Sequence, residues 1–454
     1  MKPDVVVVGG GAAGLLAALA AARGGRRVLA LEAAKDAGRK ILVSGGGRCN
    51  VLPMEDAPQR FVSESPNRLV RRFLDRWPLS EQRLFFEELL GAPLREEPES
   101  RKLFPPSNRA KDVRDALRRA LAAAGGTLRA AAPVRDVART GEGFAARLDG
   151  EEIAAPRVVL ATGGLSVLAG GADAAGYAWA QAMGHTVRRT YPALVPLTGD
   201  APAHHALAGV SLPARVNARS ERDRASSSGG FLFTHRGWSG PAVLDVSHVV
   251  ARAALAGASA EVRVCFDEIS ANGPERGPRG SGDGVLTGIA AREEKIASNG
   301  SERDTRGSQR GDAAAQWDAA LRGAGRSAGS RSLSLLPFLR KSSLPDRLAS
   351  LILEVARVPD IPLSYLSREA RARVVETLTA FPLPATGTEG YRTAEVTGGG
   401  VALEDVDPGS GESRLVPGLF LAGEMLDAFG PIGGFNFQWA WATGRTAGEA
   451  SARA

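Results

Sequence analysis

The first 32 residues carry the pattern that most limits how this chain can fold. Residues 5–8 are four valines, and such a continuous β-branched run predicts a strand buried on both faces. A glycine-rich turn follows, and the Ala/Leu-rich residues 15–23 predict a helix that ends at two glycines. A second apolar run, residues 28–31, ends in the acidic Glu32. This βαβ unit predicts an α/β fold with a parallel sheet.

The turn has the spacing Gly9-x-Gly11-x-x-Gly14, which indicates dinucleotide binding when a strand precedes it and a helix follows. Gly9 permits the tight turn, Gly11 lets the backbone approach a pyrophosphate, and Gly14 allows close packing of helix and strand. The helix N-terminus adds amide donors and a partial positive charge. Glu32 is placed to bind a ribose 2′-hydroxyl, which favours an unphosphorylated adenosine ribose. The alternative is a packing turn without a ligand.

Residues 38–50 form a second glycine-rich stretch, with two cationic clusters. Its glycines permit close approach of the backbone to a flat ring or a phosphate. On composition alone, a flexible surface loop is the alternative. Up to this point the dinucleotide can be either FAD or NAD.

Residues 38–50 closely resemble a signature of the BaiN-like family of FAD-dependent oxidoreductases. Further stretches resemble motifs of this family and follow in family order: 159–166, 191–197, 233–242, 396–401, 423–427 and 433–440. The resemblance implies a Rossmann-like FAD-binding domain of the two-dinucleotide-binding-domain type, with FAD as the bound dinucleotide.

The fingerprint and the resemblance together imply a set of cofactor-binding residues. Glu424 would lie close to ribitol hydroxyls. Gly434 would open a helix whose amides face the N1/O2 edge of the flavin, where a side chain would clash with the ring. The alternative is a surface carboxylate beside an ordinary helix start. The full set is Gly9, Gly11, Ala12, Ala13, Gly14, Glu32, Arg39, Lys40, Ser44, Gly45, Gly46, Arg48, Cys49, Asn50, Val134, Ala161, Thr162, Gly163, Gly423, Glu424, Gly433, Gly434, Phe435 and Asn436.

The chain departs from the family pattern in three places. Val167-Leu168 replaces an aromatic residue and a proline, Ala428-Phe429 follows Asp427 where a further acidic residue is common, and residues 271–331 have no counterpart. These changes fall where a substrate pocket or its cover is expected. They leave the identity of the substrate open.

We expect a discontinuous FAD-binding domain, formed by residues 1–190 and 391–454. Residues 191–390 would form an inserted substrate or cap domain of mixed β-barrel and helical structure. Within it, residues 271–331 are dominated by Gly, Ser, Arg and Asp, so we expect a flexible segment whose deletion leaves the protein folded.

Cysteines and histidines add little chemistry. The chain has two cysteines, and a dithiol cycle is not expected because Cys265 is distant in sequence from Cys49, which we interpret as a packing residue. His204-His205 is interpreted as a solvated loop, and His235 is the best candidate for a histidine that faces substrate. No metal site and no catalytic residue is assigned.

Composition limits the partners. Lys and Arg number 57 against 50 Asp and Glu, giving a net charge of +7 and a pI near 9.8. A basic surface alone is weak evidence for nucleic-acid binding, so a dedicated nucleic-acid role is not expected. No stretch reaches the ~20 apolar residues that span a bilayer. We expect a cytoplasmic protein and assign no oligomeric state.

The resemblance implies flavin-mediated hydride transfer to a small-molecule substrate, with NAD(P)H as electron donor. A second glycine fingerprint is absent from the sequence, so the nicotinamide would bind transiently over the flavin. Three alternatives stay open: an oxidase that uses oxygen, an RNA-associated flavoprotein, and a flavin-binding protein without catalysis.

Overall fold

The computed structural model describes residues 2–98, 100–166, 174–266, 305–326 and 332–453, and it divides into two compact units. The first unit combines Met1–Ala193 with Gly390–Ala454, and the second is Leu194–Glu389. The second unit is therefore an insertion in the first. Each unit has its own hydrophobic core.

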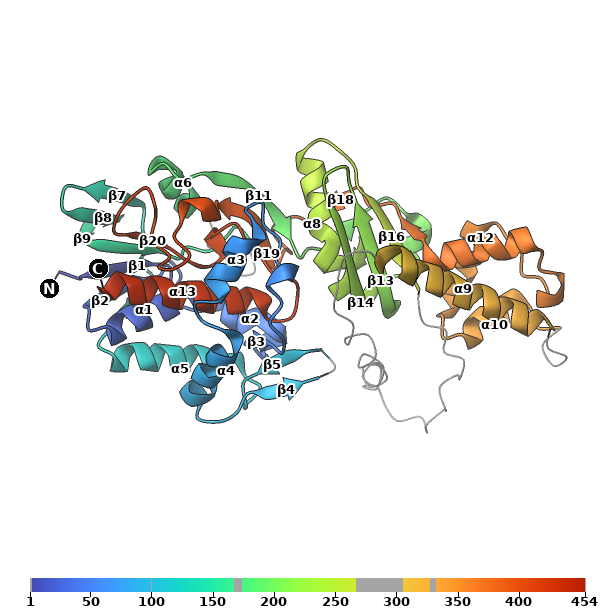
Figure 1. Ribbon diagram of the computed structural model, residues 1–454, viewed down its shortest axis with the longest axis horizontal. Coiled ribbons are helices and arrows are strands. Elements are labelled where there is room, and N and C mark those ends of the chain that lie inside the picture. The colour runs from blue at the N-terminus through green and yellow to red at the C-terminus, as the bar shows by residue number, and fades with distance from the viewer. Residues whose placement is uncertain (1, 99, 167–173, 267–304, 327–331, 454) are drawn as a thin grey trace. The chain divides into compact units, whose positions relative to one another are not determined.

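A five-stranded parallel sheet forms the centre of the first unit (Figure 1), in the order β20-β10-β1-β2-β6. Its strands are β1 (Val5–Val8), β2 (Val28–Leu31), β6 (Thr127–Arg129), β10 (Arg157–Leu160) and β20 (Leu419–Leu421). β1 lies in the middle and all four of its valines are buried, because strands flank it on both sides. The predicted parallel α/β fold is confirmed.

Helices α1 (Ala12–Arg23), α5 (Ala110–Ala123) and α13 (Phe435–Arg453) pack on one side of this sheet. Small residues let α13 lie directly on α1: a Cβ atom at Gly444 would overlap the Ala13 carbonyl, and one at Gly448 would overlap that of Ala17. The opposite side carries an antiparallel sheet of β7 (Asp136–Thr140), β8 (Gly143–Leu148) and β9 (Glu151–Ala155).

Shorter elements complete the first unit. Two small antiparallel sheets pair β3 (Leu52–Pro53) and β4 (Arg95–Glu97) with β5 (Lys102–Phe104), and β11 (Val187–Ala193) with β19 (Val396–Val401). The remaining helices are α2 (Arg39–Gly47), α3 (Asn67–Leu74), α4 (Leu79–Leu90) and α6 (Ala175–Ala182).

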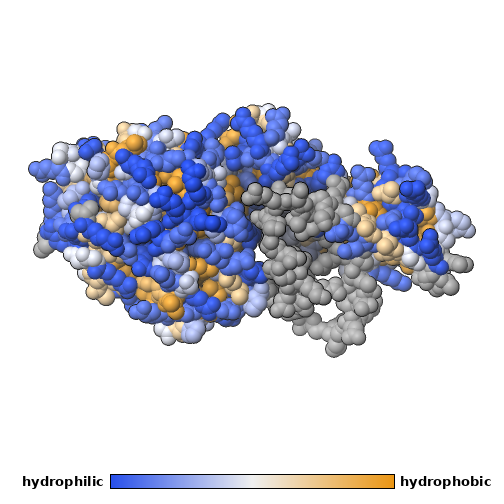
Figure 2. All heavy atoms as spheres, viewed as in Figure 1, coloured by the Kyte–Doolittle hydropathy of each residue, from blue (hydrophilic) through white to orange (hydrophobic). Residues whose placement is uncertain are grey.

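The surface of the described residues is mainly hydrophilic on the face that Figure 2 shows, with apolar residues scattered among the polar ones. Single apolar side chains such as Leu84 and Tyr365 are exposed, which is normal for a globular protein. Within the described ranges, no helix is both long enough and apolar enough to cross a membrane.

The second unit is built on a seven-stranded antiparallel sheet in the order β17-β16-β13-β14-β15-β12-β18. In the described residues β17 and β18 are its unpaired edges, so the sheet is open and differs from the expected barrel. Helices α7 (Pro202–His205) and α8 (Pro241–Leu255) belong to this part. The strands are β12 (Leu197–Thr198), β13 (Ser211–Arg219), β14 (Arg224–Thr234), β15 (Gly237–Ser239), β16 (Glu261–Cys265), β17 (Phe381–Leu383) and β18 (Gly387–Thr388).

A helical part completes the second unit, with α9 (Thr305–Arg326), α10 (Leu335–Lys341), α11 (Asp346–Ala356) and α12 (Arg368–Thr379). Helix α9 corrects the expectation of a flexible segment over all of residues 271–331; residues 271–304 and 327–331 lie outside the described residues. The reason is a helical stripe, Ala313, Trp317 and Leu321, which is buried despite the polar composition around it. The Trp317 indole also donates a hydrogen bond to the Phe266 carbonyl (2.8 Å).

Trp317→Ala is therefore expected to destabilise the protein. Removing this fully buried side chain should lower the free energy of unfolding by about 3–5 kcal/mol, the usual cost of a large aromatic in a core. Urea unfolding would measure this loss of stability. Gln316→Ala, which changes an exposed neighbour on the same helix, is the control. Equal unfolding midpoints for the two variants would show that α9 does not stabilise the second unit. Deletion of residues 271–331 should then leave the protein folded, as the composition of that segment predicts.

Candidate cofactor and active site

The predicted motifs meet at one edge of the parallel sheet. Residues 9–14 follow β1, residues 161–166 follow β10, and residues 423–424 follow β20, so all three segments leave the carboxyl ends of adjacent strands. Open α/β sheets bind their ligands at this edge. The fold therefore brings three segments that are far apart in sequence to one place.

The three glycines of the fingerprint, Gly9, Gly11 and Gly14, have different surroundings. Gly9 has a φ of +111°, and a Cβ atom there would overlap the carbonyl of Ala161, which directly follows the neighbouring strand β10. A Cβ atom at Gly14 would overlap the Gly9 carbonyl. Gly11 differs, because a Cβ atom there would meet nothing within 4 Å. Gly9 and Gly14 are thus required by packing, whereas Gly11 faces open space that a pyrophosphate could occupy.

Glu32 holds the turn in shape. One carboxylate oxygen accepts a hydrogen bond from the Gly10 amide (2.7 Å) and the other accepts one from the Ala34 amide (2.8 Å). Each oxygen keeps a second lone pair, so a ribose hydroxyl can still donate to it. The Glu32 carbonyl also accepts from Ala132, which fixes the segment that leads to Val134. Glu32 would combine a structural role with the predicted ribose contact.

The end of α2 departs from helical geometry at residues 44–46, and the loop formed there places several backbone amides in succession. Gly45, Gly46 and Gly47 have φ angles of +56°, +66° and +85°, a region that strongly favours glycine. A Cβ atom at Gly46 would meet nothing within 4 Å, and one at Gly47 only the Leu42 carbonyl at 3.9 Å. Consecutive amides in such turns form concave sites for anions. The loop therefore has the backbone and the open space that a phosphate or a flavin edge requires.

Other residues of this stretch support the loop. The Arg48 guanidinium lies 2.9 Å from Glu97 and 4.1 Å above the Phe104 ring, so it ties the loop to β4 and β5. Ser44 donates to the Ile41 carbonyl (2.9 Å), while Arg39 is exposed at the start of α2.

Cys49 is fully buried, and burial raises the pKa of its thiol to about 12. It is therefore a thiol rather than a reactive thiolate at neutral pH. Both cysteines are buried and neither forms a disulfide among the described residues, and Cys265 belongs to the second unit.

Lys40 links two of these segments to α2 by polar contacts. Its ammonium forms an ion pair with Glu424 and lies 2.6 Å from the Ser166 hydroxyl. Glu424 also accepts hydrogen bonds from the Thr397 amide (2.9 Å) and from Ser166 (3.2 Å). The Lys40 and Glu424 side chains are 27% and 17% exposed, so solvent screens this pair only in part. The sequence indicates Lys40 and Glu424 separately but gives no signal for their pairing. Ser166 and Thr397 lie in the family-like stretches 159–166 and 396–401, but the sequence does not single them out as site residues.

The start of α13 is fixed by other protein groups. Gly434 has a φ of +97°, and a Cβ atom there would lie 2.5 Å from the Leu52 carbonyl carbon. A side chain at Gly434 would thus collide with the backbone of β3, a constraint that is independent of the predicted clash with a flavin ring. With its amide oriented to satisfy both groups, Asn50 accepts from the Gly434 amide (2.9 Å) and donates to Leu52 (3.2 Å).

Neighbouring residues of this motif also have structural partners. Asn436 exchanges two hydrogen bonds of 2.9 Å with the backbone of Gly430, and Phe435 packs edge-to-face on Phe61. Gly433 is less restricted, since the nearest atom to a Cβ there is 3.6 Å away, on Phe435. Gly423 donates to Thr443 (2.9 Å).

Asp427 is a buried carboxylate that the sequence marks only as part of a motif. It accepts hydrogen bonds from the amides of Glu64 (2.9 Å) and Ser65 (3.2 Å) and from the Ser63 hydroxyl (3.2 Å). Burial nevertheless raises its pKa to about 6, because desolvation outweighs these donors. Asp427 thus anchors residues 63–65 beside the sheet edge.

Asp427→Asn is expected to change the pH dependence of stability. A carboxyl whose pKa is raised on folding, here from 3.8 to about 6, binds more protons in the folded state between these values. The contribution of Asp427 to the free energy of unfolding is therefore greatest at low pH, and it is lost as the pH rises through the folded-state pKa. A shift of about two units corresponds to about 3 kcal/mol.

Urea unfolding of wild type and Asp427→Asn at pH 4, 6 and 8 measures this effect. Between pH 4 and pH 8 the wild type should lose up to about 3 kcal/mol of unfolding free energy relative to the variant, whose amide does not titrate. Parallel pH profiles of the two proteins would contradict the raised pKa of Asp427.

The histidines lie elsewhere. His204 is buried in α7 and stacks on Phe381 (5.0 Å between ring centroids), which corrects the expectation of a solvated loop. Burial lowers its pKa to about 4, so the ring is neutral. His235 and Arg236 are exposed in the β14–β15 turn. In the parts of the chain that the structure describes, no cluster of His, Cys, Asp or Glu could hold a metal ion.

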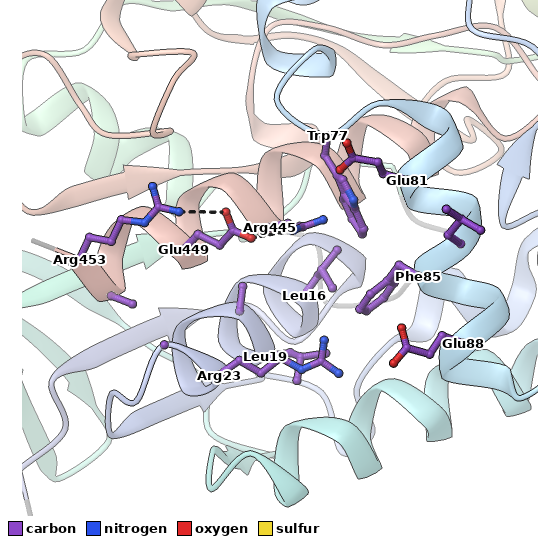
Figure 3. A pocket seen from close by; sticks show the side chains of 14 residues that line it. Leu16, Leu19, Arg23, Trp77, Glu81, Phe85, Glu88, Arg445, Glu449 and Arg453 are labelled. Carbon is purple, nitrogen blue, oxygen red and sulfur yellow. Dashed lines mark hydrogen bonds and ion pairs between the residues drawn. The ribbon is translucent and has the colours of Figure 1, made fainter.

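A groove of about 620 Å³ lies on a different part of the first unit (Figure 3). It is formed by α1, α4 and α13 and is lined by apolar side chains such as Leu16, Leu19 and Phe85, with charged residues at its margins. None of the predicted cofactor-binding residues lines it. The groove is therefore separate from the site at the sheet edge.

The fold and this edge define a dinucleotide-binding domain of the Rossmann type. Residues 3–450 match the family described as HI0933-like protein Rossmann domain, so the chain belongs to the HI0933-like family.

Three relatives cover nearly the whole chain. The chain is 30% identical to the ribosomal RNA dihydrouridine synthase of Escherichia coli, over 97% of this chain and 96% of that protein. It is 30% identical to the 3-dehydro-bile acid delta(4,6)-reductase of Clostridium scindens, over 94% and 93%. It is 29% identical to the ribosomal RNA dihydrouridine synthase of Haemophilus influenzae, over 92% and 91%. The predicted BaiN-like resemblance is confirmed.

Proposed function

We propose that this protein is an FAD-dependent reductase that saturates a carbon–carbon double bond conjugated to a carbonyl group, with NAD(P)H as electron donor. The observation that carries the cofactor assignment is the contrast among the turn glycines: packing requires Gly9 and Gly14, but only a ligand would require Gly11. Glu32 and the amides of residues 45–47 would bind the ribose and the phosphate or flavin edge. Bound FAD would supply a two-electron carrier between NAD(P)H and the substrate.

The reaction class comes from what the relatives' substrates share. Dihydrouridine is uridine with its ring carbon–carbon double bond saturated, and that bond is conjugated to a carbonyl. The name of the Clostridium scindens relative describes double bonds at positions 4 and 6 of a 3-oxo compound, which are conjugated in the same way. In the proposed reaction the β-carbon receives a hydride and the α-carbon a proton, while NAD(P)H becomes NAD(P)⁺.

For the substrate we propose first a uridine in RNA and second a small conjugated ketone. The family resemblance alone favours a small molecule and leaves an RNA-associated flavoprotein as an alternative. Two relatives named for ribosomal RNA and the basic pI of 9.8 support the RNA substrate. The bile-acid reductase, which is equally similar in sequence, supports the small ketone.

The reductive half of the reaction can be tested without knowing the substrate. The purified full chain should release FAD on denaturation, and the bound flavin should lose its oxidised absorbance when NADH or NADPH is added without oxygen. A comparison of the two nucleotides would identify the donor. A folded protein that takes up NAD but not FAD, or an FAD that neither nucleotide reduces, would contradict the proposal.

A further inference from the structure

We propose that one face of the sheet in the second unit binds the phosphate backbone of RNA. This inference rests on the RNA substrate proposed above and assigns the surface that would hold it. The surface, called the arginine face here, consists of seven side chains on three adjacent strands: Arg215, Asn217 and Arg219 of β13, Arg224, Ser226 and Ser228 of β14, and Arg263 of β16. The same register also places Glu261 and Cys265 of β16 on this side of the sheet.

The register places these side chains on the same side of the sheet. Along β13, Ala214, Val216 and Ala218 are buried, and the residues between them point the other way. Ser227 shows which side is covered, because its hydroxyl bonds to Asp245 of α8 (2.9 Å). Its neighbours Ser226 and Ser228 are exposed. The arginine face is therefore the side of β13 and β14 opposite α8.

Cross-strand pairing concentrates positive charge on this face. Arg219 lies directly opposite Arg224 on one side and opposite Glu261 on the other. Glu261 already forms an ion pair with Arg263 (2.5 Å). Both Arg219 and Arg224 are exposed. Like charges placed directly opposite each other destabilise a strand pair, and an anion bound between the two guanidinium groups would relieve that repulsion.

The chemistry of the face fits nucleic-acid phosphates better than a protein partner. Arg, Ser and Asn are among the side chains that bind phosphate oxygens, whereas the cores of protein interfaces are rich in aromatic residues and methionine. None of the seven side chains is apolar. Arg224 and Ser228, four residues apart on one strand, are about 14 Å from each other along it. The face could therefore contact several phosphates of one backbone.

The test is the salt dependence of RNA binding by the FAD-loaded full chain. The double variant Arg219→Gln/Arg224→Gln should bind an in vitro transcript of bacterial ribosomal RNA about tenfold more weakly or worse. The slope of log affinity against log salt should fall by about 1–2, as expected when two phosphate contacts are lost. Arg135→Gln/Arg147→Gln, at exposed positions of the first unit, is the matched control and should bind as wild type.

The outcomes separate this inference from the proposed function. If wild type binds the transcript and the Arg219/Arg224 variant binds with the same affinity and slope, RNA binding by the arginine face is contradicted. The proposal that RNA is the substrate is then unaffected. If wild type does not bind RNA, or binds anionic lipid vesicles in preference, both proposals are contradicted: RNA binding by the arginine face and RNA as the substrate. The rate at which NAD(P)H reduces bound FAD should be equal in wild type and both variants. If NAD(P)H reduces the flavin in none of the three proteins, the proposed function itself is contradicted.

Discussion

Gly11→Val should leave the protein folded but unable to retain FAD. The Gly11 backbone has φ and ψ of −74° and −168°, which any residue can adopt, and a Cβ atom there meets nothing within 4 Å. The substitution should therefore cost about 1 kcal/mol or less in stability, the usual effect at a helix N-cap. A branched side chain would occupy the space assigned to the pyrophosphate. FAD affinity should fall at least about 100-fold, or about 2.7 kcal/mol.

Gly14→Val is the matched comparison, because it tests a glycine that packing requires. A Cβ atom at Gly14 would overlap the Gly9 carbonyl, so this variant should lose about 3 kcal/mol or more of stability. Thermal unfolding and titration with FAD would measure both effects for both variants. Full FAD affinity in a folded Gly11→Val protein would remove the pyrophosphate from this turn. Equal stability of the two variants would contradict the packing argument.

Lys40→Met should destabilise the site strongly, because it leaves the carboxylate of Glu424 partly buried without its cation. The remaining donors to Glu424 are the Thr397 amide and Ser166. We expect a loss of about 3 kcal/mol in unfolding free energy, at the low end for a buried pair since both side chains keep some exposure. FAD affinity should fall about tenfold or more, because the variant also disturbs the carboxylate assigned to the ribitol.

A double-mutant cycle with Glu424→Gln isolates the contribution of the pair. The two single variants should together lose more stability than the double variant, with a coupling energy of about 1–3 kcal/mol. Urea unfolding of the FAD-free proteins measures the pair itself, and the same cycle on FAD affinity measures its role in binding. Additive losses would show that Lys40 and Glu424 act independently.

The strongest local patterns predicted the fold of the first unit. A run of four valines, a glycine turn and an Ala/Leu-rich stretch depend only on neighbouring residues, and they became β1, the 9–14 turn and α1. Helix α9 was missed because its buried stripe of Ala313, Trp317 and Leu321 is set among glycines, serines and charged residues. A mean composition hides such a stripe, whereas i, i+4, i+8 spacing would have found it.

The sequence indicated candidate site residues but not the contacts between them. The fingerprint and the family motifs indicated Lys40 and Glu424, yet these residues are 384 positions apart and only the tertiary fold brings them together. Gly434 shows the same limit. The sequence marked it as special, but the backbone of β3 is what leaves no room for a side chain there, and periodicity and motif spacing do not reveal that contact. Pairing and packing are three-dimensional properties, so they needed the structure.

The oxidative half-reaction tests the central claim most directly. The FAD-loaded protein would be reduced by NAD(P)H without oxygen and then mixed with a bacterial ribosomal RNA transcript or with a conjugated 3-oxo steroid, while flavin reoxidation and the mass of the product are followed. We predict that one of these substrates, the RNA first, reoxidises the flavin and gains two hydrogens. Reoxidation by oxygen alone, with both substrates recovered unchanged, would contradict the account and identify an oxidase instead.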